Sequence, residues 1–512
     1  MTGNPTMRGA ICLAVLAGTA WPQGPPQNSA GAPSQAMQLP LSGRAVSQNG
    51  SVNSVQSPIP GVTSSVNTLN SSVQVQGPYS GSSDVKPFGG KLSFREAIDH
   101  ALEYNLGIGG ITAAIRQARG QSKVARGALL PNLSAALRET VQQSDLAALG
   151  VRINIPVPGF QFPTVVGPFN YFDLRATLTQ TVADLTALNN YRSAGELIKA
   201  NEAAMRDARD LVVLATGGVY LQAVAANARI RSAEAQRETA NALLRQTQDR
   251  RSVGLVAQID VNRAQVELQT QEQRLTTLRN EVSKQKIALA RIAGLPVTDA
   301  YDLVDDIPYS AAPVLSVEQA MQQALVNRAD LQSASFQVRS AERARTAARA
   351  ERLPSLALSA DYGAIGVNPS QSHGTFGVTG TLRIPIWAGG RTEGAIEQAE
   401  AALDQRRSEA ADVRGRIVAD VRSAFLDLQA ASQQVDLARN NQAVARDTLG
   451  LTRQRYEAGI ADSVEVIQAQ QAIASAELDY ITAVFADNLA KVSLARAMGK
   501  AETSVGPLLG LR

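Results

Sequence analysis

An internal repeat constrains the fold of this chain more than any other feature. Residues 92–133 align without a gap with residues 315–356, and twelve of these 42 positions are identical. A second pair of segments, 250–294 and 455–499, also aligns and ends in LARIAG and LARAMG. A duplicated pattern of this length predicts two copies of one structural unit. We place the first repeat at 91–314, the second at 315–500 and a C-terminal tail at 501–512.

Each repeat is predicted to contain a helix, two strands, a long helix, a turn and a further helix. The first helix runs from Ser93 to about Leu129, because Pro131 cannot continue it. Its counterpart runs from Ser316 to about Arg352. The offset between the repeats falls from 223 to 205 residues, so the first contains 18 additional residues. We expect most of them in an insertion at 151–169.

After these helices the sequence changes to a period of two residues. Apolar and polar residues alternate in YFDLRATLTQTV and TFGVTGTLRIPI, which predicts strands at about 132–182 and 354–388. An ordinary half-buried sheet gives the same alternation. The aromatic residues favour a membrane barrel, because five lie within residues 160–172 and Trp387 ends the fourth strand, as in interfacial girdles. Four strands cannot close a barrel, so several chains must contribute to one sheet.

The helices after the strands are too long for a globular domain. Residues 186–249 contain no proline and would span roughly 96 Å, and residues 392–457 would span roughly 99 Å. Their apolar residues recur at heptad spacing, for example at Ile417, Val421 and Ala424, with small residues at alternate positions. This pattern is typical of closely packed coiled coils, and it requires partners along the whole length.

The N-terminus has the pattern of an export signal. Residues 1–20 combine Arg8, a run of about twelve apolar residues and small residues at 18 and 20. Residues 21–90 are rich in Ser, Gly, Pro, Gln and Asn and are predicted to form a disordered tether. The only cysteine, Cys12, lies within the signal, so we expect no disulfide or thiolate site in the mature chain.

Other classes of function find little support in the sequence. Acidic residues accompany the basic ones in a net charge of only +4, so no nucleic-acid partner is expected. After the signal we identify no run of about 20 apolar residues, which argues against a membrane-spanning helix. His100 and His373 lie far apart, and the motifs of metalloproteases, serine hydrolases and phosphate-binding loops are missing. Neither an enzyme nor a cofactor is therefore predicted.

The duplicated order of elements resembles the TolC-type outer membrane efflux channel family over about residues 91–499. LLPNL and RLPSL precede the strand pairs, and each repeat carries a glycine turn between long helices. The resemblance implies an α+β membrane protein, a homotrimer with one 12-stranded barrel in outer membrane lipid, continued by an α-helical barrel. It further implies passive export from a Gram-negative-type cell, with substrates delivered by a periplasmic adaptor and an inner-membrane pump in efflux or type I secretion.

The glycine turns would form the periplasmic tips of two helical hairpins. Glycine suits the positive φ that a tight turn between helices requires. Plain turn residues without a partner are the alternative interpretation. By resemblance, the tips dock on the adaptor and comprise Val253, Gly254, Leu255, Ala458, Gly459 and Ile460.

Polar links next to the tips close the duct in this family. Its aspartate and tyrosine match Asp260 and Tyr456, and one of its pore-lining acidic residues matches Glu465. Three copies of Glu465 would form a carboxylate ring that concentrates cations, and a solvated helix position is the alternative. We expect Asp260→Ala or Tyr456→Phe to loosen the closed end. The chain departs from the family at Ile259, Ala461 and Gln468, which weakens the expected ionic lock.

A second hypothesis is a secreted coiled-coil structural or adhesive protein whose short strands cap a helical stalk. The repeated strand pairs, each with one apolar face, favour the duct. The sequence does not identify the exported substrate.

Overall fold

The computed structural model describes residues 88–148, 150, 164–297, 301–306, 309–311 and 315–510. The predicted signal at 1–20, the predicted tether up to residue 87, and residues 151–163 of the predicted insertion lie outside this part of the chain.

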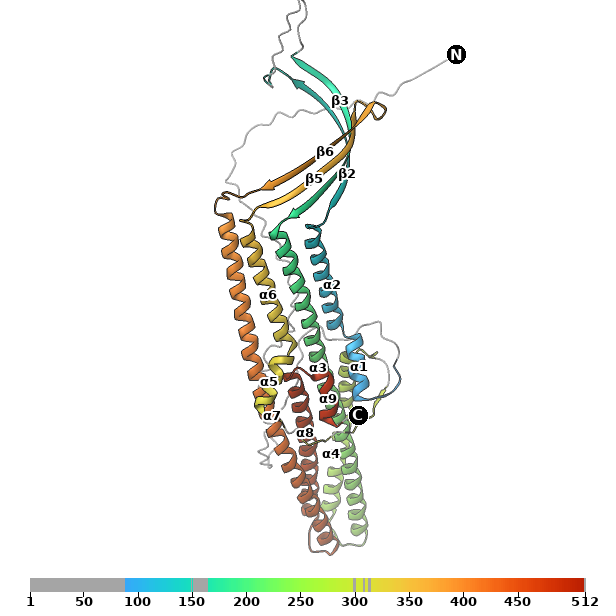
Figure 1. The fold of residues 1–512 in the computed structure, drawn as a ribbon. Coiled ribbons are helices and arrows are strands. Elements are labelled where there is room, and N and C mark those ends of the chain that lie inside the picture. The colour runs from blue at the N-terminus through green and yellow to red at the C-terminus, as the bar shows by residue number, and fades with distance from the viewer. Residues whose placement is uncertain are drawn as a thin grey trace, which may run out of the picture. The chain divides into compact units, whose positions relative to one another are not determined.

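Each repeat contains one helix of the length that the sequence predicts. The two helices have 68 and 67 residues, so each spans roughly 100 Å. The heptad residues of the second, such as Ile417, Val421 and Leu428, are buried. The helices are α1 (Phe94–Tyr104), α2 (Leu106–Gly127), α3 (Leu185–Ser252), α4 (Gln258–Ala293), α5 (Val317–Asn327), α6 (Ala329–Ala350), α7 (Arg391–Glu457), α8 (Ser463–Ala497) and α9 (Ala501–Leu509) (Figure 1).

The core lies between these helices, and α3 is its centre. Helix α3 packs against α2, α4, α6 and α8, and α9, which lies within the predicted tail, packs against α3 and α8. One 18-residue window of α3 has a mean hydropathy of 1.5, which the sequence analysis overlooked. Because 72% of this window is buried against the chain itself, we interpret it as part of the core.

The first helix of each repeat is broken, where the sequence predicted continuous helices at 93–129 and 316–352. Asn105 separates α1 from α2, and its side chain accepts a hydrogen bond from the amide of Gly107 at 2.9 Å, which caps α2. Arg328, at the equivalent position of the second repeat, separates α5 from α6. The prediction was wrong because one non-helical residue does not disturb the apolar period on either side.

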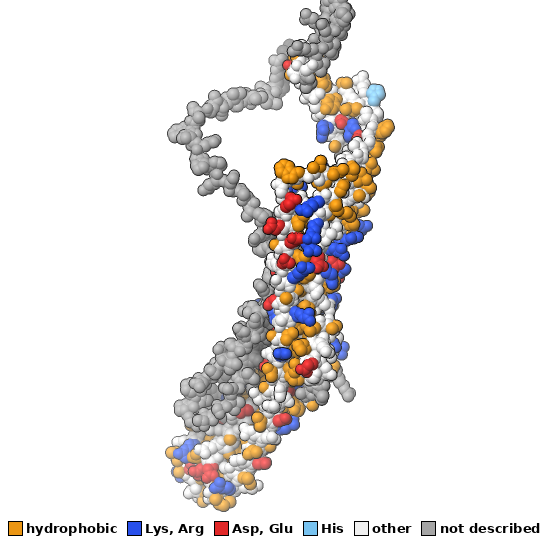
Figure 2. All heavy atoms as spheres, turned by 60° about the vertical axis from the view of Figure 1, so that its left-hand side comes forward, with side chains coloured by type: hydrophobic (Ala, Val, Ile, Leu, Met, Phe, Trp, Pro, Cys, Tyr) orange, Lys and Arg blue, Asp and Glu red, His pale blue; other side chains and the backbone are white. Residues whose placement is uncertain are grey.

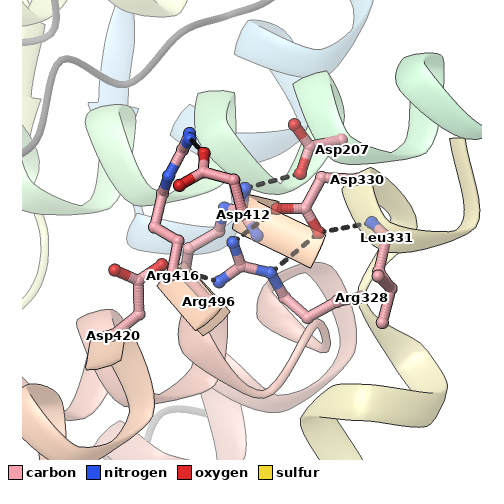
Figure 3. A network of polar contacts seen from close by, with 8 residues as sticks. All are labelled: Asp207, Arg328, Asp330, Leu331, Asp412, Arg416, Asp420 and Arg496. Carbon is pink, nitrogen blue, oxygen red and sulfur yellow. Dashed lines mark hydrogen bonds and ion pairs between the residues drawn. The ribbon is translucent and has the colours of Figure 1, made fainter. Parts of the chain in front are cut away.

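Ion pairs of two buried arginines, Arg328 and Arg496, surround the break (Figure 3). The Arg328 side chain is 5% exposed and lies 2.6 Å from Asp330 and 3.3 Å from Asp420. Arg496 of α8 pairs with Asp207 of α3 at 2.5 Å. Burial alone would raise the pKa of Asp330, but the hydrogen bond and charge of Arg328 outweigh it and hold that pKa below its usual value. The network joins α3, α6, α7 and α8 at the break.

Four strands form an antiparallel sheet in the order β2-β3-β5-β6. Its edges are β2 and β6. Helices α2 and α6 lead into β2 and β5, and β3 and β6 lead into α3 and α7. A separate two-stranded parallel sheet joins β1 to β4. The strands are β1 (Gly90–Leu92), β2 (Asn132–Asp145), β3 (Val165–Ala183), β4 (Tyr301–Leu303), β5 (Ser355–Gly366) and β6 (Ser372–Arg383), and a short 3-10 helix (Pro369–Gln371) precedes β6.

The register of the sheet gathers apolar side chains on one face. Ala135 lies opposite Ala176, which lies opposite Tyr362, which lies opposite Phe376. Tyr362 and Phe376 are 69% and 80% exposed, so the described part of the chain leaves this face uncovered. The predicted alternation is confirmed, and the alternative of an ordinary half-buried sheet does not fit the exposure of these side chains.

The opposite face of the sheet carries charge. Arg175 of β3 pairs with Asp173 at 3.3 Å and with Asp361 of β5, and it donates a hydrogen bond to Thr375 of β6 at 3.2 Å. The two faces of one sheet therefore suit two different surroundings, one apolar and one aqueous.

The strand ends differ from the prediction in two places. Strand β6 ends at Arg383 rather than at Trp387, because its partner β5 begins at Ser355 and Pro385 has no amide proton for the ladder. Strands β2 and β3 have 14 and 19 residues, whereas β5 and β6 have 12 each. Part of the 18-residue surplus therefore lengthens strands, and residues 165–169 of the predicted insertion belong to β3.

Candidate functional site

The hairpins α3–α4 and α7–α8 end in the same type of turn. Gly254 has a φ of 79° and Gly459 a φ of 73°. In both turns the amide after the glycine donates to the carbonyl five residues earlier, at 2.9 Å. This bond with a left-handed glycine is the Schellman cap, which satisfies carbonyls at the end of a helix. The repeat therefore preserves the turn as well as the helices.

The tips present apolar side chains to the surroundings. Leu255 is 74% exposed, and Val253 and Ile460 are exposed to a similar extent. A Cβ atom added at Gly254 or Gly459 would meet no atom within 4 Å among the described residues. Only the positive φ therefore restricts these two positions, and the space around them is open.

Asp260 links the two hairpins. It lies in the first turn of α4, and its carboxylate accepts a hydrogen bond from the hydroxyl of Ser463 in α8 at 2.8 Å. The same carboxylate accepts the amide of Ala257 at 3.3 Å and lies 3.6 Å from Arg263. Asp260 thus caps its own helix and also contacts the other hairpin.

Tyr456 links the hairpins through its ring and its carbonyl. The side chain is 4% exposed and packs with Leu243 and Val466. The guanidinium carbon of Arg250 in α3 lies 4.3 Å from the ring centre, and Arg250 donates to the carbonyl of Tyr456 at 3.0 Å. The Tyr456 hydroxyl is buried and has no hydrogen-bond partner among the described residues. The hydroxyl therefore contributes no link within this chain.

Glu465 has a partner in its own hairpin. Its carboxylate lies 3.2 Å from the guanidinium of Arg455, and both side chains are about half exposed. By the repeat alignment, Arg455 and Glu465 correspond to Arg250 and Asp260. In the described part of the chain, Arg455 and Glu465 contact each other within one hairpin. Arg250 and Asp260 instead each contact a residue of the neighbouring hairpin. Equivalent arginine and carboxylate positions in the two repeats therefore make different contacts.

Sequence reasoning missed Arg250, Ser463 and Arg455. The alignment of the repeats was the available signal, because it places Arg250 and Arg455 at equivalent positions directly before the two turns. Of the positions that depart from the family, Ile259 is exposed and Ala461 packs beside Tyr456. A groove of about 310 Å³ opens beside Tyr456 between α3 and the α7–α8 hairpin.

The comparison with known proteins gives a family match in two segments. The chain matches the outer membrane efflux protein family over residues 97–295 and 320–500. It belongs to this family. The outer membrane protein OprJ of Pseudomonas aeruginosa is 26% identical over 456 residues, which cover 83% of this chain and 88% of OprJ. The outer membrane protein TolC of Escherichia coli is 22% identical over 343 residues, which cover 63% of this chain and 68% of TolC.

Solved structures share the fold. The CmeC outer membrane channel of Campylobacter jejuni gives a TM-score of 0.68 at 18% identity, with 80% of this chain and 86% of CmeC covered. The outer membrane protein VceC of Vibrio cholerae gives 0.65 at 19% identity, with 79% and 96% covered. This protein is therefore an outer membrane efflux channel of the TolC type and a transport protein, and its family consists of channels, not enzymes.

Proposed function

We propose that three copies of this chain form a passive channel-tunnel, with one 12-stranded barrel in the outer membrane and an α-helical barrel in the periplasm. The four-stranded sheet carries this proposal. It has one uncovered apolar face, one charged face and two edges, β2 and β6, that pair with no further strand in the described part of the chain. Closing such sheets into a barrel places the apolar face against lipid and removes the edges.

The internal repeat supplies the pattern for the contact between copies. Helices α2, α3, α6 and α7 pack in that order. Because α2 corresponds to α6 and α3 to α7, the α3–α6 contact predicts how α7 meets α2 of the next copy. The hydroxyls of Ser193 and Ser340 lie 3.0 Å apart in the α3–α6 contact. Their repeat equivalents are Gln398 and Gln117, which are both exposed.

Cysteine cross-linking tests this arrangement directly. Cys12 is the only cysteine of the chain, so Gln117→Cys with Gln398→Cys introduces a single defined pair. We expect oxidation to yield covalent trimers in outer membranes. The matched control, Gln117→Cys with Asn440→Cys lower on α7, should not cross-link. Cross-links in the control, or none in the test pair, would contradict the predicted contact.

The tips and the links beside them have separate proposed roles. The exposed turns at Gly254 and Gly459 dock on a periplasmic adaptor protein, which connects the channel to an inner-membrane pump. The contacts of Asp260 and Tyr456 hold the periplasmic end nearly closed, and Glu465 adds a ring of three carboxylates. The pairing of Glu465 with Arg455 reduces the negative charge of this ring.

Single-channel conductance in a planar bilayer tests the duct itself. The purified oligomer should show a small, persistent and cation-selective current, because the closed end is narrow and carries carboxylates. A multivalent cation should reduce the current. Oligomers of verified insertion that carry no current would contradict the proposal and would favour a structural role.

A further inference from the structure

A large apolar side chain is exposed at each of the four junctions between the helices and the sheet. The strand ends that adjoin α2, α3, α6 and α7 lie together at the end of the sheet nearest the helices, because the register pairs them with one another. Ile386 and Trp387, between β6 and α7, are 95% and 87% exposed. We call the following residues the apolar collar: Leu130, Leu185, Leu353, Ile384, Ile386 and Trp387.

Cations lie in the helix turns beside the apolar collar. Figure 2 shows Lys and Arg side chains gathered on the helices next to the sheet, with Asp and Glu among them. Two of the carboxylates, Glu393 and Glu400, pair with Arg352 and Arg349. Glu351 forms no such pair within the part of the chain that the structure describes. Four exposed cations on these helices have no carboxylate partner within the described residues, namely Lys123, Arg126, Arg192 and Arg391.

A neighbouring copy of the chain cannot cover the whole collar. In the proposed barrel, a neighbouring copy meets this chain at the outer elements, which are α2 with β2 and α7 with β6. Leu185 and Leu353 lie at the two central junctions, away from both edges. A partner that contacts all four junctions must extend across the whole helix-proximal end of the sheet. A lipid leaflet surrounding the barrel would do so.

The chemistry of the collar fits one leaflet in particular. Tryptophan favours the boundary between headgroups and acyl chains, where its ring is apolar and its indole amide can reach water. Lysine and arginine beside such a boundary attract anionic lipid headgroups. We propose that the apolar collar and the four helix cations beside it bind the anionic phospholipids of the inner leaflet of the outer membrane, with Trp387 at the headgroup boundary. This inference rests on the proposed barrel.

Tryptophan fluorescence tests the position of Trp387. The chain has two tryptophans, so Trp21→Phe leaves Trp387 as the only one. The full-length variant is reconstituted into vesicles of phosphatidylcholine and phosphatidylglycerol that carry a quencher either near the headgroup or deep in the acyl chain. We expect the shallow quencher to reduce Trp387 fluorescence more than the deep one, and we expect a blue-shifted emission.

Two reporters calibrate the depth in the Trp21→Phe, Trp387→Phe background. Phe376→Trp reports the exposed apolar face of β6, and Val444→Trp reports an exposed position on α7. The deep quencher should act on the first, and neither should act on the second. If Phe376→Trp is quenched but Trp387 is not, the collar faces the lumen or another copy, and this inference fails alone. If neither is quenched, the proposed barrel fails as well.

The cations are tested by lipid composition. Quenching of Trp387 by the shallow quencher should increase with the share of phosphatidylglycerol. Arg126→Gln with Arg391→Gln should reduce this increase, whereas Arg455→Gln at the distant tip should leave it unchanged. An increase that is equal in all three proteins would overturn the role of the cations.

Discussion

The guanidinium of Arg250 lies 4.3 Å from the ring centre of Tyr456, in the other hairpin. Its repeat equivalent, Arg455, instead lies 3.2 Å from Glu465 in its own hairpin. Of these two equivalent arginines, Arg250 contacts the other hairpin and Arg455 pairs within its own. The structure therefore adds a stacked arginine to the contacts of Asp260 and Tyr456 that we propose close the tunnel.

Replacing Arg250 should loosen the closed end. Arg250→Ala removes the stacking on Tyr456 and two hydrogen bonds to carbonyls of α7, at 3.0 and 3.4 Å. We expect the conductance of the closed channel to rise. Arg245→Ala is the matched control, because Arg245 is exposed on the same helix and forms no ion pair within the described residues. A rise of equal size in both variants would contradict a specific role of Arg250.

The hydroxyl of Tyr456 should be dispensable although its ring is not. The sequence analysis expected Tyr456→Phe to loosen the closed end. In the structure the buried hydroxyl has no partner among the described residues, so its removal breaks no bond. We now expect Tyr456→Phe to conduct like the unmodified channel and Tyr456→Ala to conduct more. A leaky Tyr456→Phe channel would show that the hydroxyl bonds to a group of another copy.

Asp260 and Ser463 should act as one unit. Asp260→Ala and Ser463→Ala each remove the same 2.8 Å hydrogen bond. Hydrogen bonds to a charged group contribute about 1.5–3 kcal/mol, and paired residues give non-additive effects. We expect the double variant to conduct no more than Asp260→Ala alone. Additive increases in conductance would place the two residues in separate contacts.

The sequence predicted elements better than contacts, and the reason is physical. Periodicity indicates which face of a helix or strand is apolar. The helices α3 and α7 and the alternation in β2, β3, β5 and β6 could therefore be predicted from the sequence. A single break such as Asn105 leaves the period intact, and the end of β6 depends on where its partner strand begins. At the tips, the sequence located Asp260 and Tyr456, but the direction of the Arg250 side chain depends on tertiary packing.

The tip glycines should tolerate asparagine better than valine. Gly254 and Gly459 have positive φ, which costs a residue with a Cβ atom about 1–2 kcal/mol. Asparagine adopts this conformation more readily than a β-branched residue does. We expect Gly254→Val to abolish dye efflux from cells while trimers remain intact in cross-linking, and Gly254→Asn to retain part of the efflux. Normal efflux in the valine variant would remove the proposed docking role.

Loss of Arg328 should destabilise the chain. Arg328→Ala leaves the carboxylate of Asp330, which is 24% exposed, without its buried partner. Breaking a fully buried pair costs about 3–5 kcal/mol, and we expect a smaller loss here because Asp330 is partly solvated. Arg416→Ala is the control, because its pair with Asp412 lies beside the same network but is exposed, and exposed pairs contribute about 0–1 kcal/mol. Thermal unfolding in detergent at neutral pH should show a clear loss of Tm only in the first variant.

The effect of Arg328 should also depend on pH. Arg328 holds the pKa of Asp330 below the ordinary value of 3.8, so the folded chain releases this proton more readily than the unfolded chain. The stabilisation by the pair is therefore complete above that value and is lost as the pH falls through the lowered pKa. We expect the difference in Tm between Arg328→Ala and the unmodified protein to shrink at acid pH. A difference that stays constant from neutral to acid pH would show that Arg328 stabilises the break by packing rather than by charge.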